Sequence, residues 1–343
     1  MITGEHHKMT QRRIAELAGV SQATVSLVLN GKADALSRIP EETRQRVMDV
    51  IQETTYVADP AARRLAGAGN NILGVFTYEP AFPSEGLDFY TPLFTGIEAE
   101  AESIGCDLLM FTSAPVENGR RRIFHENNRL GLADGCLLLG LEMDGVELAR
   151  LVASGYPFVS VGRRDAEGVP YVGVDYAAGT ATLVRTARDL GHQRFFYLHF
   201  NSDGESVRDR LTGWHREVDG VRFQTRAAND LAADWTAIKA FAPSVLFVEA
   251  PADADALHEL ALADGIEIPK DLSMVVLGEA SRTRDQAIDF TRLSPPRSQL
   301  GANAVTLLSR ILSPTDLVTE SELRVLLDCP IVDGSTLTPP SSR

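Results

Sequence analysis

The sequence predicts an α/β protein with a helix-turn-helix head of three helices, a hinge helix, and a body of two doubly wound α/β subdomains. Three observations predict this organisation. Apolar residues recur with helical spacing in three segments of the head, and a short helical pattern followed by glycines comes next. Short continuous apolar runs then alternate with helical segments to the end of the chain. The expected bounds are 8–58 for the head, 59–70 for the hinge and linker, and 71–343 for the body.

The first two helices of the head are joined by a tight turn. Their apolar stripes consist of Ile14, Leu17 and Ala18 in the first helix and of Val25, Val28 and Leu29 in the second. Thr10 is placed to cap the first helix, and Ser21 is placed to cap the second. Gly19 ends the first helix, because such a turn usually requires a residue that tolerates positive φ. The second helix of a helix-turn-helix can enter the major groove of DNA.

A third helix and a shorter helical stretch complete the N-terminal region. The third helix is entered through Pro40, and its stripe consists of Val47, Val50 and Ile51. Residues 56–67 then form a short helical pattern with Asp59 as its cap and Pro60 at its start. This stretch is too short to be a stable helix alone, so we expect it to fold only when something binds it.

Two series of apolar runs predict the strands of the body. The first series is Ile72–Phe76, Cys106–Thr112, Gly135–Leu139, Phe158–Val161 and Tyr171–Val174, and the second is Arg194–His199, Pro243–Val248 and Ser273–Leu277. Helical segments such as Thr91–Ile104, Ala177–Leu190 and Asp253–Asp264 lie between them. Continuous apolar strands separated by helices indicate parallel sheets covered on both faces. Two such sheets imply two subdomains with a ligand-binding cleft between them.

The charges are distributed unevenly along the chain. The net charge is −14, which by itself argues against binding nucleic acid. Residues 1–68 hold nine of the 33 Lys and Arg and eight of the 47 Asp and Glu, a net charge of +1. The other 24 basic and 39 acidic residues leave the body with a net charge of −15. This pattern fits a protein that touches DNA at one end only.

Other classes of protein lack their signatures in this sequence. No stretch approaches the ~20 apolar residues of a membrane span, and the N-terminus lacks the apolar run of a secretory signal. The cysteines Cys106, Cys136 and Cys329 lie far apart in apolar surroundings, as buried reduced thiols do. No motif typical of a hydrolase, a zinc protease or a nucleotide-binding loop is present. We therefore expect a cytoplasmic protein that is not an enzyme, without catalytic residues, metal or cofactor.

The motifs of the head, in order, closely resemble the lactose-repressor (LacI/GalR) family. They are A15-E-L-A-G-V-S21, T24-V-S26, V28-L-N-G31, E42-T-R-Q-R-V47, Y56 and P60-A-A-R-R-L65. The resemblance continues through the body in I72-L-G-V-F76, V172-G-V-D-Y-A-A-G179, S206-V-R-D-R-L-T-G-W214 and L293-S-P-P-R-S-Q-L-G-A-N-A304. It implies a body similar to a periplasmic sugar-binding protein that dimerises side by side, and a chain that crosses three times between subdomains. The expected bounds are about 71–163 and 293–322 for the N-subdomain, and about 164–292 and 323–343 for the C-subdomain.

The resemblance also implies DNA contacts on the second helix and on the hinge. Gln22 lies where the family has a base-reading side chain, and a glutamine amide can pair bidentately with adenine. Ala23 can contact a thymine methyl, whereas Leu27, where many relatives carry arginine, cannot pair with guanine. Leu65 matches a leucine that wedges into the minor groove, with ordinary hinge packing as the alternative. The other expected residues contact phosphates or cap helices, and they are Thr10, Ser21, Thr24, Ser26, Asn30, Arg63 and Arg64. For Arg63 and Arg64 the alternative is that they only solvate the hinge.

In the cleft, the resemblance implies effector contacts from several segments. Arg208 matches a family arginine that contacts the effector, with a surface ion pair as the alternative. Phe89 and Tyr90 lie where relatives have aromatic pocket residues, with core packing as the alternative. Asp175 matches an aspartate near the subdomain junction, where a structural role is also open. The complete expected set is Phe89, Tyr90, Arg163, Asp175, Arg208, Glu249 and Glu279.

The chain departs from the family pattern where relatives hold sugar hydroxyls. Relatives usually carry Asn-Asp after the strand that ends at Val248, and here those positions read Ala250-Pro251. A later landmark of the G-F-D-D type is replaced by Val276-Leu277-Gly278-Glu279. Glu249, Asp253 or Glu279 could compensate, but a simple sugar is not carried over as the ligand. An atypical effector, or none, stays open.

Together these observations predict a homodimeric transcriptional regulator, most readily a repressor. It would bind a palindromic operator in double-stranded DNA and respond to a small-molecule effector in the cleft. Two alternatives stay open: a cytoplasmic α/β binding protein or enzyme with a DNA-binding appendage, and a regulator that has lost its response to an effector.

Overall fold

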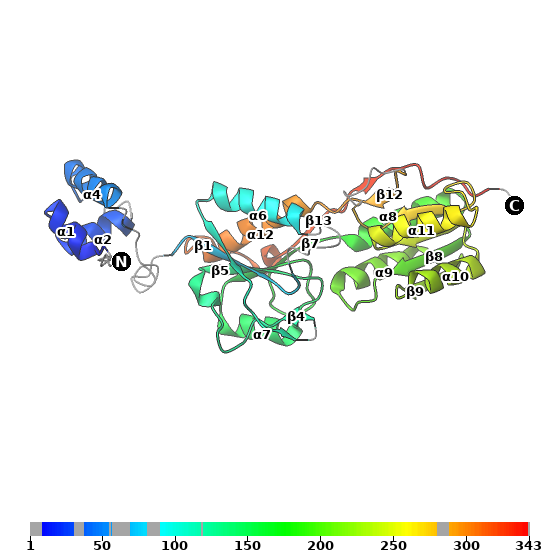
Figure 1. The fold of residues 1–343 in the computed structure, drawn as a ribbon, viewed down its shortest axis with the longest axis horizontal. Coiled ribbons are helices and arrows are strands. Elements are labelled where there is room, and N and C mark those ends of the chain that lie inside the picture. The colour runs from blue at the N-terminus through cyan, green and yellow to red at the C-terminus, as the bar shows by residue number, and fades with distance from the viewer. Residues whose placement is uncertain are drawn as a thin grey trace, which may run out of the picture. The chain divides into compact units, whose positions relative to one another are not determined.

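The computed structural model describes residues 9–30, 38–54, 56, 69–80, 90–117, 119–279 and 288–341. The chain forms two units, which divide between Asn70 and Asn71, and each unit is described by itself. Figure 1 shows the helices of the first unit and the α/β body. Of the hinge and linker expected at 59–70, only residues 69 and 70 are described.

In its described residues, the first unit contains helices α1 (Gln11–Ala18), α2 (Gln22–Asn30) and α4 (Glu41–Glu53). The Oγ1 atom of Thr10 accepts a hydrogen bond from the backbone N–H of Arg13 at 3.3 Å, so Thr10 caps α1 as predicted. Gly19 ends α1 with φ of 67°, the left-handed conformation that its turn requires. The Nε atom of Arg46 on α4 donates to the carbonyl oxygen of Ala18 at 2.9 Å, which ties the third helix to this turn.

The core of the head lies where the three helices meet. Its fully buried side chains are Ile14, Ala15, Ala18, Val25 and Val47. Leu17 was expected in the stripe of α1, but 48% of it is exposed, and that expectation was wrong. Ala15 takes its place because α2 and α4 approach α1 from a direction that helical spacing alone does not specify.

Two six-stranded sheets form the body, and within the body they lie end to end (Figure 1). The first has the order β13-β7-β6-β5-β1-β2 and is parallel throughout. Its strands are β1 (Ile72–Thr77), β2 (Asp107–Phe111), β5 (Gly135–Leu139), β6 (Phe158–Val161), β7 (Tyr171–Val174) and β13 (Arg324–Leu327). A short hairpin, β3 (Val116–Glu117) and β4 (Arg120–Arg121), and two 3₁₀ turns, η1 (Leu130–Leu132) and η2 (Glu320–Leu323), lie outside this sheet.

The second sheet has the order β14-β12-β11-β10-β8-β9, in which only β14 is antiparallel to its neighbour. Its strands are β8 (Arg194–His199), β9 (Arg222–Ala227), β10 (Val245–Val248), β11 (Ser273–Val276), β12 (Thr291–Leu293) and β14 (Ile331–Val332). Helices α8 (Tyr176–Asp189) and α9 (Glu205–Glu217) cover one face, and α10 (Leu231–Phe241) and α11 (Pro251–Ala263) cover the other. Two doubly wound subdomains are therefore present.

Helices α6 (Thr91–Ser103) and α12 (Arg297–Leu312) cover one face of the first sheet, and α7 (Gly145–Ser154) covers the other. Helices α6 and α12 cross closely because each carries a glycine at the contact. A Cβ atom on Gly96 would lie 1.9 Å from the carbonyl oxygen of Ser298, and one on Gly301 would lie 2.3 Å from that of Leu93. This crossing brings the N-termini of both helices to the same end of the sheet.

The strand order locates the crossings between the subdomains. The chain leaves the first sheet after β7, returns to it after β12, and leaves it again between β13 and β14. The subdomain boundaries predicted at 163/164 and 322/323 are therefore wrong, because each lies before a strand that still belongs to the first sheet. Tyr171–Val174 pairs with β6 and Arg324–Leu327 pairs with β7, so both segments belong to the first sheet.

Candidate functional site

The outer face of α2 is the candidate DNA-reading surface. Gln22 and Ala23 are exposed, and Leu27 is 44% exposed, while Val25 on the opposite side is fully buried. No acidic residue lies in the first turn of α2. The helix therefore exposes an amide, a methyl group and an apolar side chain, and its first turn lacks a carboxylate that would repel phosphates.

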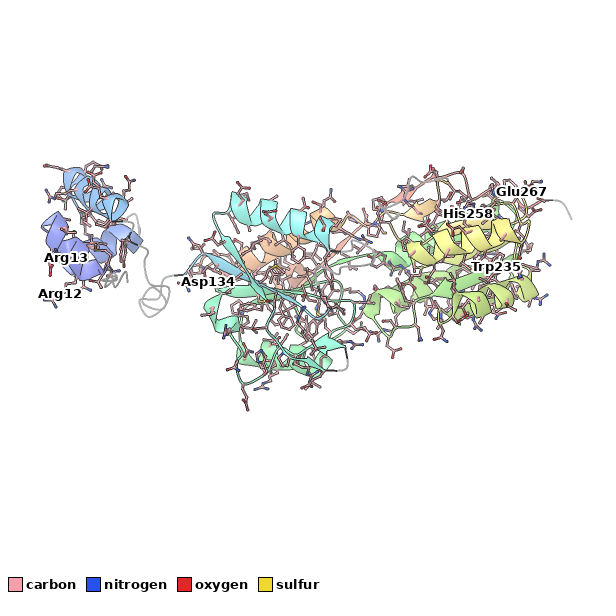
Figure 2. The ribbon with its side chains drawn as sticks, viewed as in Figure 1. Arg12, Arg13, Asp134, Trp235, His258 and Glu267 are labelled. Atoms are coloured by element: carbon pink, nitrogen blue, oxygen red, sulfur yellow. The ribbon has the colours of Figure 1, made fainter. Side chains whose placement is uncertain are left out.

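The start of α2 is held by its own side chains. The Oγ atom of Ser21 accepts from the backbone N–H of Thr24 at 3.1 Å, and the two hydroxyl oxygens lie 2.9 Å apart. Ser26 is partly buried on the same helix. The neighbouring helix α1 projects Arg12 and Arg13 outward (Figure 2), and both pair with Glu16.

Several predicted contacts lie outside the described residues. They are Arg63, Arg64, Leu65 and Phe89, together with the side chain of Asn30.

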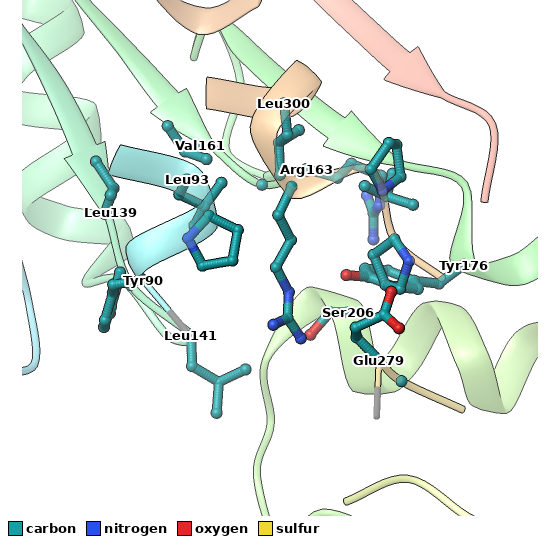
Figure 3. Close-up of a pocket in the computed structure, with 18 of the residues that line it drawn as sticks. Tyr90, Leu93, Leu139, Leu141, Val161, Arg163, Tyr176, Ser206, Glu279 and Leu300 are labelled. Carbon is teal, nitrogen blue, oxygen red and sulfur yellow. The ribbon is translucent and has the colours of Figure 1, made fainter. Parts of the chain in front are cut away.

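A cavity of about 640 Å³ lies between the two subdomains of the body. The first subdomain contributes the carboxyl ends of β5, β6 and β7 and the N-termini of α6 and α12. The second contributes the start of α9 and the segments after β8, β10 and β11. This is the edge at which parallel α/β sheets bind ligands. Figure 3 shows Leu93, Leu139, Val161 and Leu300 on one side of the cavity and Ser206 and Glu279 on the other.

The arginine that α9 presents to the cavity is Arg210. Its guanidinium stacks on the ring of Tyr176 at 3.6 Å, and its Nη1 atom donates to Glu249 at 3.1 Å. Arg208, the expected effector contact, does not line the cavity; its side chain is 52% exposed, and it pairs with Asp165 at 2.7 Å. Residues two apart on a helix point in different directions, so the position of the cleft selects Arg210.

Glu249 is buried at the base of the cavity and is fully engaged by the protein. Besides Arg210, its carboxylate accepts from the Tyr197 hydroxyl at 3.0 Å and from the backbone N–H of Phe200 at 3.1 Å. Burial, with the Glu249 carboxylate as a second cause, raises the pKa of Tyr197 well above its usual value.

The other predicted cleft residues divide between the cavity and the scaffold. Tyr90 lines the cavity and donates to Glu79 at 2.7 Å, and burial together with that carboxylate raises the pKa of Tyr90. Glu279 also lines the cavity and accepts from Ser294 at 2.6 Å. Asp175 is not among the lining residues; it caps α8 by accepting from the backbone N–H of Ala178 at 2.9 Å.

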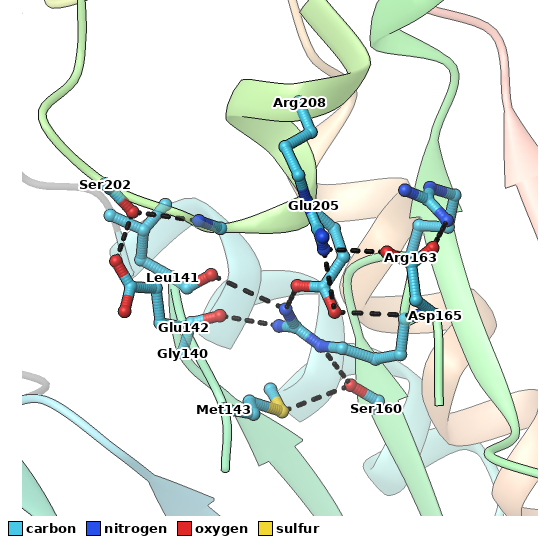
Figure 4. Close-up of polar contacts among 12 residues, drawn as sticks. Gly140, Leu141, Glu142, Met143, Ser160, Arg163, Asp165, Ser202, Glu205 and Arg208 are labelled. Atoms are coloured by element: carbon cyan, nitrogen blue, oxygen red, sulfur yellow. Dashed lines mark hydrogen bonds and ion pairs between the residues drawn. The ribbon is translucent and has the colours of Figure 1, made fainter. Parts of the chain in front are cut away.

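One side of the cleft is closed by ion pairs between the subdomains (Figure 4). Arg163, which follows β6, donates to both carboxylate oxygens of Asp209 on α9 at 2.7 Å each. These hydrogen bonds raise the pKa of Arg163. Arg163 also pairs with Asp165, and this hydrogen bond lowers the pKa of the Asp165 carboxyl.

Arg164 forms the most buried of these pairs. It donates to Glu205, the first residue of α9, at 2.7 Å, and its side chain is only 3% exposed. The same guanidinium donates to the Gly140 carbonyl at 2.7 Å and to the Ser160 hydroxyl at 3.0 Å. Pairs of this kind were not predicted, because each joins residues about 40 positions apart whose side chains meet only when the cleft forms.

Within the described part of the chain, no helix has the length and apolar character that crossing a membrane requires. Among the same residues, no three His, Cys, Asp or Glu side chains come together as a metal site would need.

A helix-turn-helix joined to a two-subdomain body with a cavity between its sheets defines a class of protein, the ligand-responsive DNA-binding regulator. Comparisons of sequence agree. Residues 11–59 match the family described as "Bacterial regulatory proteins, lacI family". The chain is 27% identical over 341 residues to the HTH-type transcriptional regulator CelR of Thermobifida fusca, covering 92% of this chain and 97% of that protein. It is 26% identical over 232 residues to the lactose operon repressor of Escherichia coli (strain K12), covering 66% of this chain and 61% of the repressor.

Comparisons of structure support the same fold. The lac repressor dimer bound to operator and the anti-inducer ONPF aligns with a TM-score of 0.75 at 19% identity, over 96% of this chain and 99% of that chain. A complex of the transcriptional regulator CelR with cellobiose aligns with a TM-score of 0.61 at 23% identity, over 96% and 99% of the two chains. Residues 11–59 therefore carry the DNA-binding head of the lacI family, and nearly the whole chain is similar to a DNA-binding transcriptional regulator.

Proposed function

We propose that this regulator is a repressor that binds a palindromic operator as a homodimer. Its affinity for the operator would fall or rise when a small molecule occupies the cavity. The observation that carries the proposal is the cavity itself, which lies at the strand ends where two subdomains meet. Support comes from relatives whose structures are described as an operator-bound dimer and as a complex with cellobiose.

Base reading is assigned to the outer face of α2, through Gln22, Ala23 and Leu27. Thr10, Ser21, Thr24, Ser26 and Asn30 are proposed to contact phosphates or to hold the helix ends, as are Arg63 and Arg64 on the hinge. At the cavity, Tyr90, Arg163, Arg210, Glu249 and Glu279 are proposed to shape the effector site, with Phe89 beside Tyr90. Arg210 replaces Arg208 in this set, and Asp175 is assigned to the cap of α8.

The proposed mechanism is a coupling between two sites. A ligand that opens or closes the cleft would shift the first subdomain of each protomer relative to that of its partner. This shift would change the distance between the two hinge segments of the dimer. A coupling free energy of roughly 1–3 kcal/mol would change operator affinity by about 5- to 150-fold.

The hinge offers a direct test. Leu65→Ala is expected to weaken binding to the specific operator more than binding to random DNA, because a wedge into the minor groove acts only where the duplex kinks. Fluorescence anisotropy on a palindrome from the upstream region of its own gene, against a shuffled duplex, measures both affinities. An equal loss on the two duplexes would remove the wedge from the mechanism.

The alternative, an enzyme or binding protein with a DNA-binding appendage, predicts a different result. The full chain would then show no preference for any upstream palindrome over bulk genomic fragments, and candidate substrates would turn over in its presence. A preference for one palindrome without turnover supports the regulator.

A further inference from the structure

The walls of the cavity are mainly apolar. Leu93, Leu141, Val161, Leu300 and Pro251 are among the lining residues and come from both subdomains. A volume of about 640 Å³ lies in the range of sites that enclose drug-sized ligands. The size and the walls together favour a ligand with an extended apolar body.

The carboxylates that line the cavity already accept hydrogen bonds from the protein. Glu249, for example, has three protein donors, the Arg210 guanidinium, the Tyr197 hydroxyl and the Phe200 N–H, at 3.0–3.1 Å. Asp209 accepts from Arg163, and Glu279 accepts from Arg292 and Ser294. Glu79 accepts from the Tyr90 hydroxyl and the Leu141 N–H. A carboxylate has about four acceptor sites in all, so these donors leave fewer of them for the hydroxyls of a sugar.

The cavity is also balanced in charge. Among the described residues, the lining contains four arginines and four carboxylates, whose formal charges sum to zero: Arg163, Arg164, Arg210 and Arg297, and Glu79, Asp209, Glu249 and Glu279. A charged ligand would lose its hydration without gaining a net counter-charge from these residues, which is unfavourable.

From these three observations we infer that the cavity binds an uncharged molecule with an apolar body of one or two rings, rather than a free sugar or an organic anion. This inference rests on the proposed role of the cavity as the effector site. The body of the ligand would lie against Leu93, Leu141 and Leu300. The neutral side chains of Ser206 and Gln299, which also line the cavity, are available to orient its polar end.

A fluorescence titration of the full-length protein tests the ligand class. The probe is prodan, an uncharged naphthalene dye whose emission shifts to the blue in apolar surroundings. We expect saturable binding with a blue shift, and we expect neither cellobiose nor naphthoate, an anion with the same ring system, to displace the dye. Displacement by cellobiose or by naphthoate, or the absence of saturable dye binding, would overturn the inference.

Matched variants locate the dye. Leu141 is 38% exposed and lines the cavity, whereas Leu262 on α11 is 55% exposed and does not. Leu141→Ser is expected to weaken dye binding about tenfold, from the loss of apolar contact, and Leu262→Ser is expected to leave it unchanged. Ser206→Phe, which fills the cavity from α9, is expected to block the dye and serves as a second variant. Equal affinities in all these variants would show that the dye binds elsewhere and would contradict the inference.

Operator binding, measured in the same samples, separates this inference from the proposed function. If cellobiose binds and changes the affinity for the operator, the inference of an apolar ligand is wrong, and the proposed control by an effector still holds. Dye that binds in the cavity without changing operator affinity would support the ligand class and count against effector control.

Discussion

Arg164 shows how much one side chain contributes to joining the two subdomains. Its guanidinium is buried between Gly140 and Ser160 of the first subdomain and Glu205 of the second. Breaking a buried pair leaves a charge without its partner, which costs more than the pair itself contributed. Arg208, by contrast, joins the same two subdomains through a pair with Asp165 in which both side chains are about half exposed.

This contrast makes a prediction about stability. Arg164→Met is expected to lower the free energy of unfolding of the body by about 3 kcal/mol, because the mostly buried Glu205 loses its nearest counter-charge. Arg208→Met, the matched control, is expected to cost less than about 1 kcal/mol. Urea unfolding followed by tryptophan fluorescence measures both values. Similar losses in the two variants would mean that burial does not distinguish the pairs.

His192 is a buried histidine whose proton position follows from its contact. Its Nε2 atom lies 2.9 Å from the carbonyl oxygen of Thr338, which can only accept, so Nε2 carries the proton. Its Nδ1 atom is buried without a hydrogen-bond partner among the described residues. Burial lowers the pKa of His192, because a charged imidazole is not solvated there.

The lowered pKa of His192 predicts a dependence of stability on pH. Below about pH 6.5 the unfolded imidazole binds a proton that the folded one does not, so stability falls as the pH decreases from there towards the folded pKa. His192→Gln is expected to reduce the drop in melting temperature between about pH 7.5 and 5.5. His215→Gln, at an exposed position, is the control and should keep the drop of the unaltered protein. A drop of the same size in His192→Gln would exclude His192 as its source.

At the scale of elements, α2 carries the prediction about sequence preference. Val25 anchors the helix in the core of the head, which leaves Gln22 in the exposed first turn. Gln22→Ala is expected to relax preference at one base position per half-site by about 1–3 kcal/mol, because a bidentate contact to adenine is lost. Selection from a randomised duplex library measures the preference at each position.

A matched glutamine on another helix provides the control. Gln45 is exposed on α4, where it donates to Asp49 at 2.9 Å, and Gln45→Ala should leave every base preference intact. An unchanged preference in the Gln22 variant would remove this residue from base reading.

At the scale of the whole molecule, the acidic body and the nearly neutral head imply that affinity depends on two heads acting together. One head alone has few cationic side chains, and the net charge of −15 on the body repels the duplex. Binding to a duplex with only one half-site is therefore expected to be at least about 100-fold weaker than binding to the full palindrome.

Sedimentation of the protein with and without the two duplexes measures this difference together with the stoichiometry. A monomer that binds the half-site and the palindrome equally would contradict the proposed dimer.

The head and the alternation of strands and helices could be predicted from the sequence, because both depend on local patterns. Thr10 and Gly19 stand at the ends of α1 as their types require, and the apolar runs became buried strands. The edge strand β9 was missed, since Arg222–Ala227 is polar and only partly buried. The strand series grouped β7 with the first sheet, but the predicted boundary at 163/164 placed it in the second subdomain. That boundary was wrong, because the partner of a strand is a long-range property.

The cavity could be predicted in kind but not in detail. The strand pattern indicated a cleft, and Tyr90, Arg163, Glu249 and Glu279 do line it. Arg208 was chosen over Arg210 because the motif holds two arginines that sequence spacing alone cannot distinguish. Only the packing of α9 against the second sheet decides which of them points into the cleft.

What the sequence alone determined is the set of elements and the class of regulator, since periodicity, caps and the motifs of the head are properties of neighbouring residues. The tertiary structure decided which charges meet across the cleft and which carboxylates are already engaged. Those pairings join residues that are far apart along the chain, and their energies depend on burial, which exists only once the two subdomains have packed together.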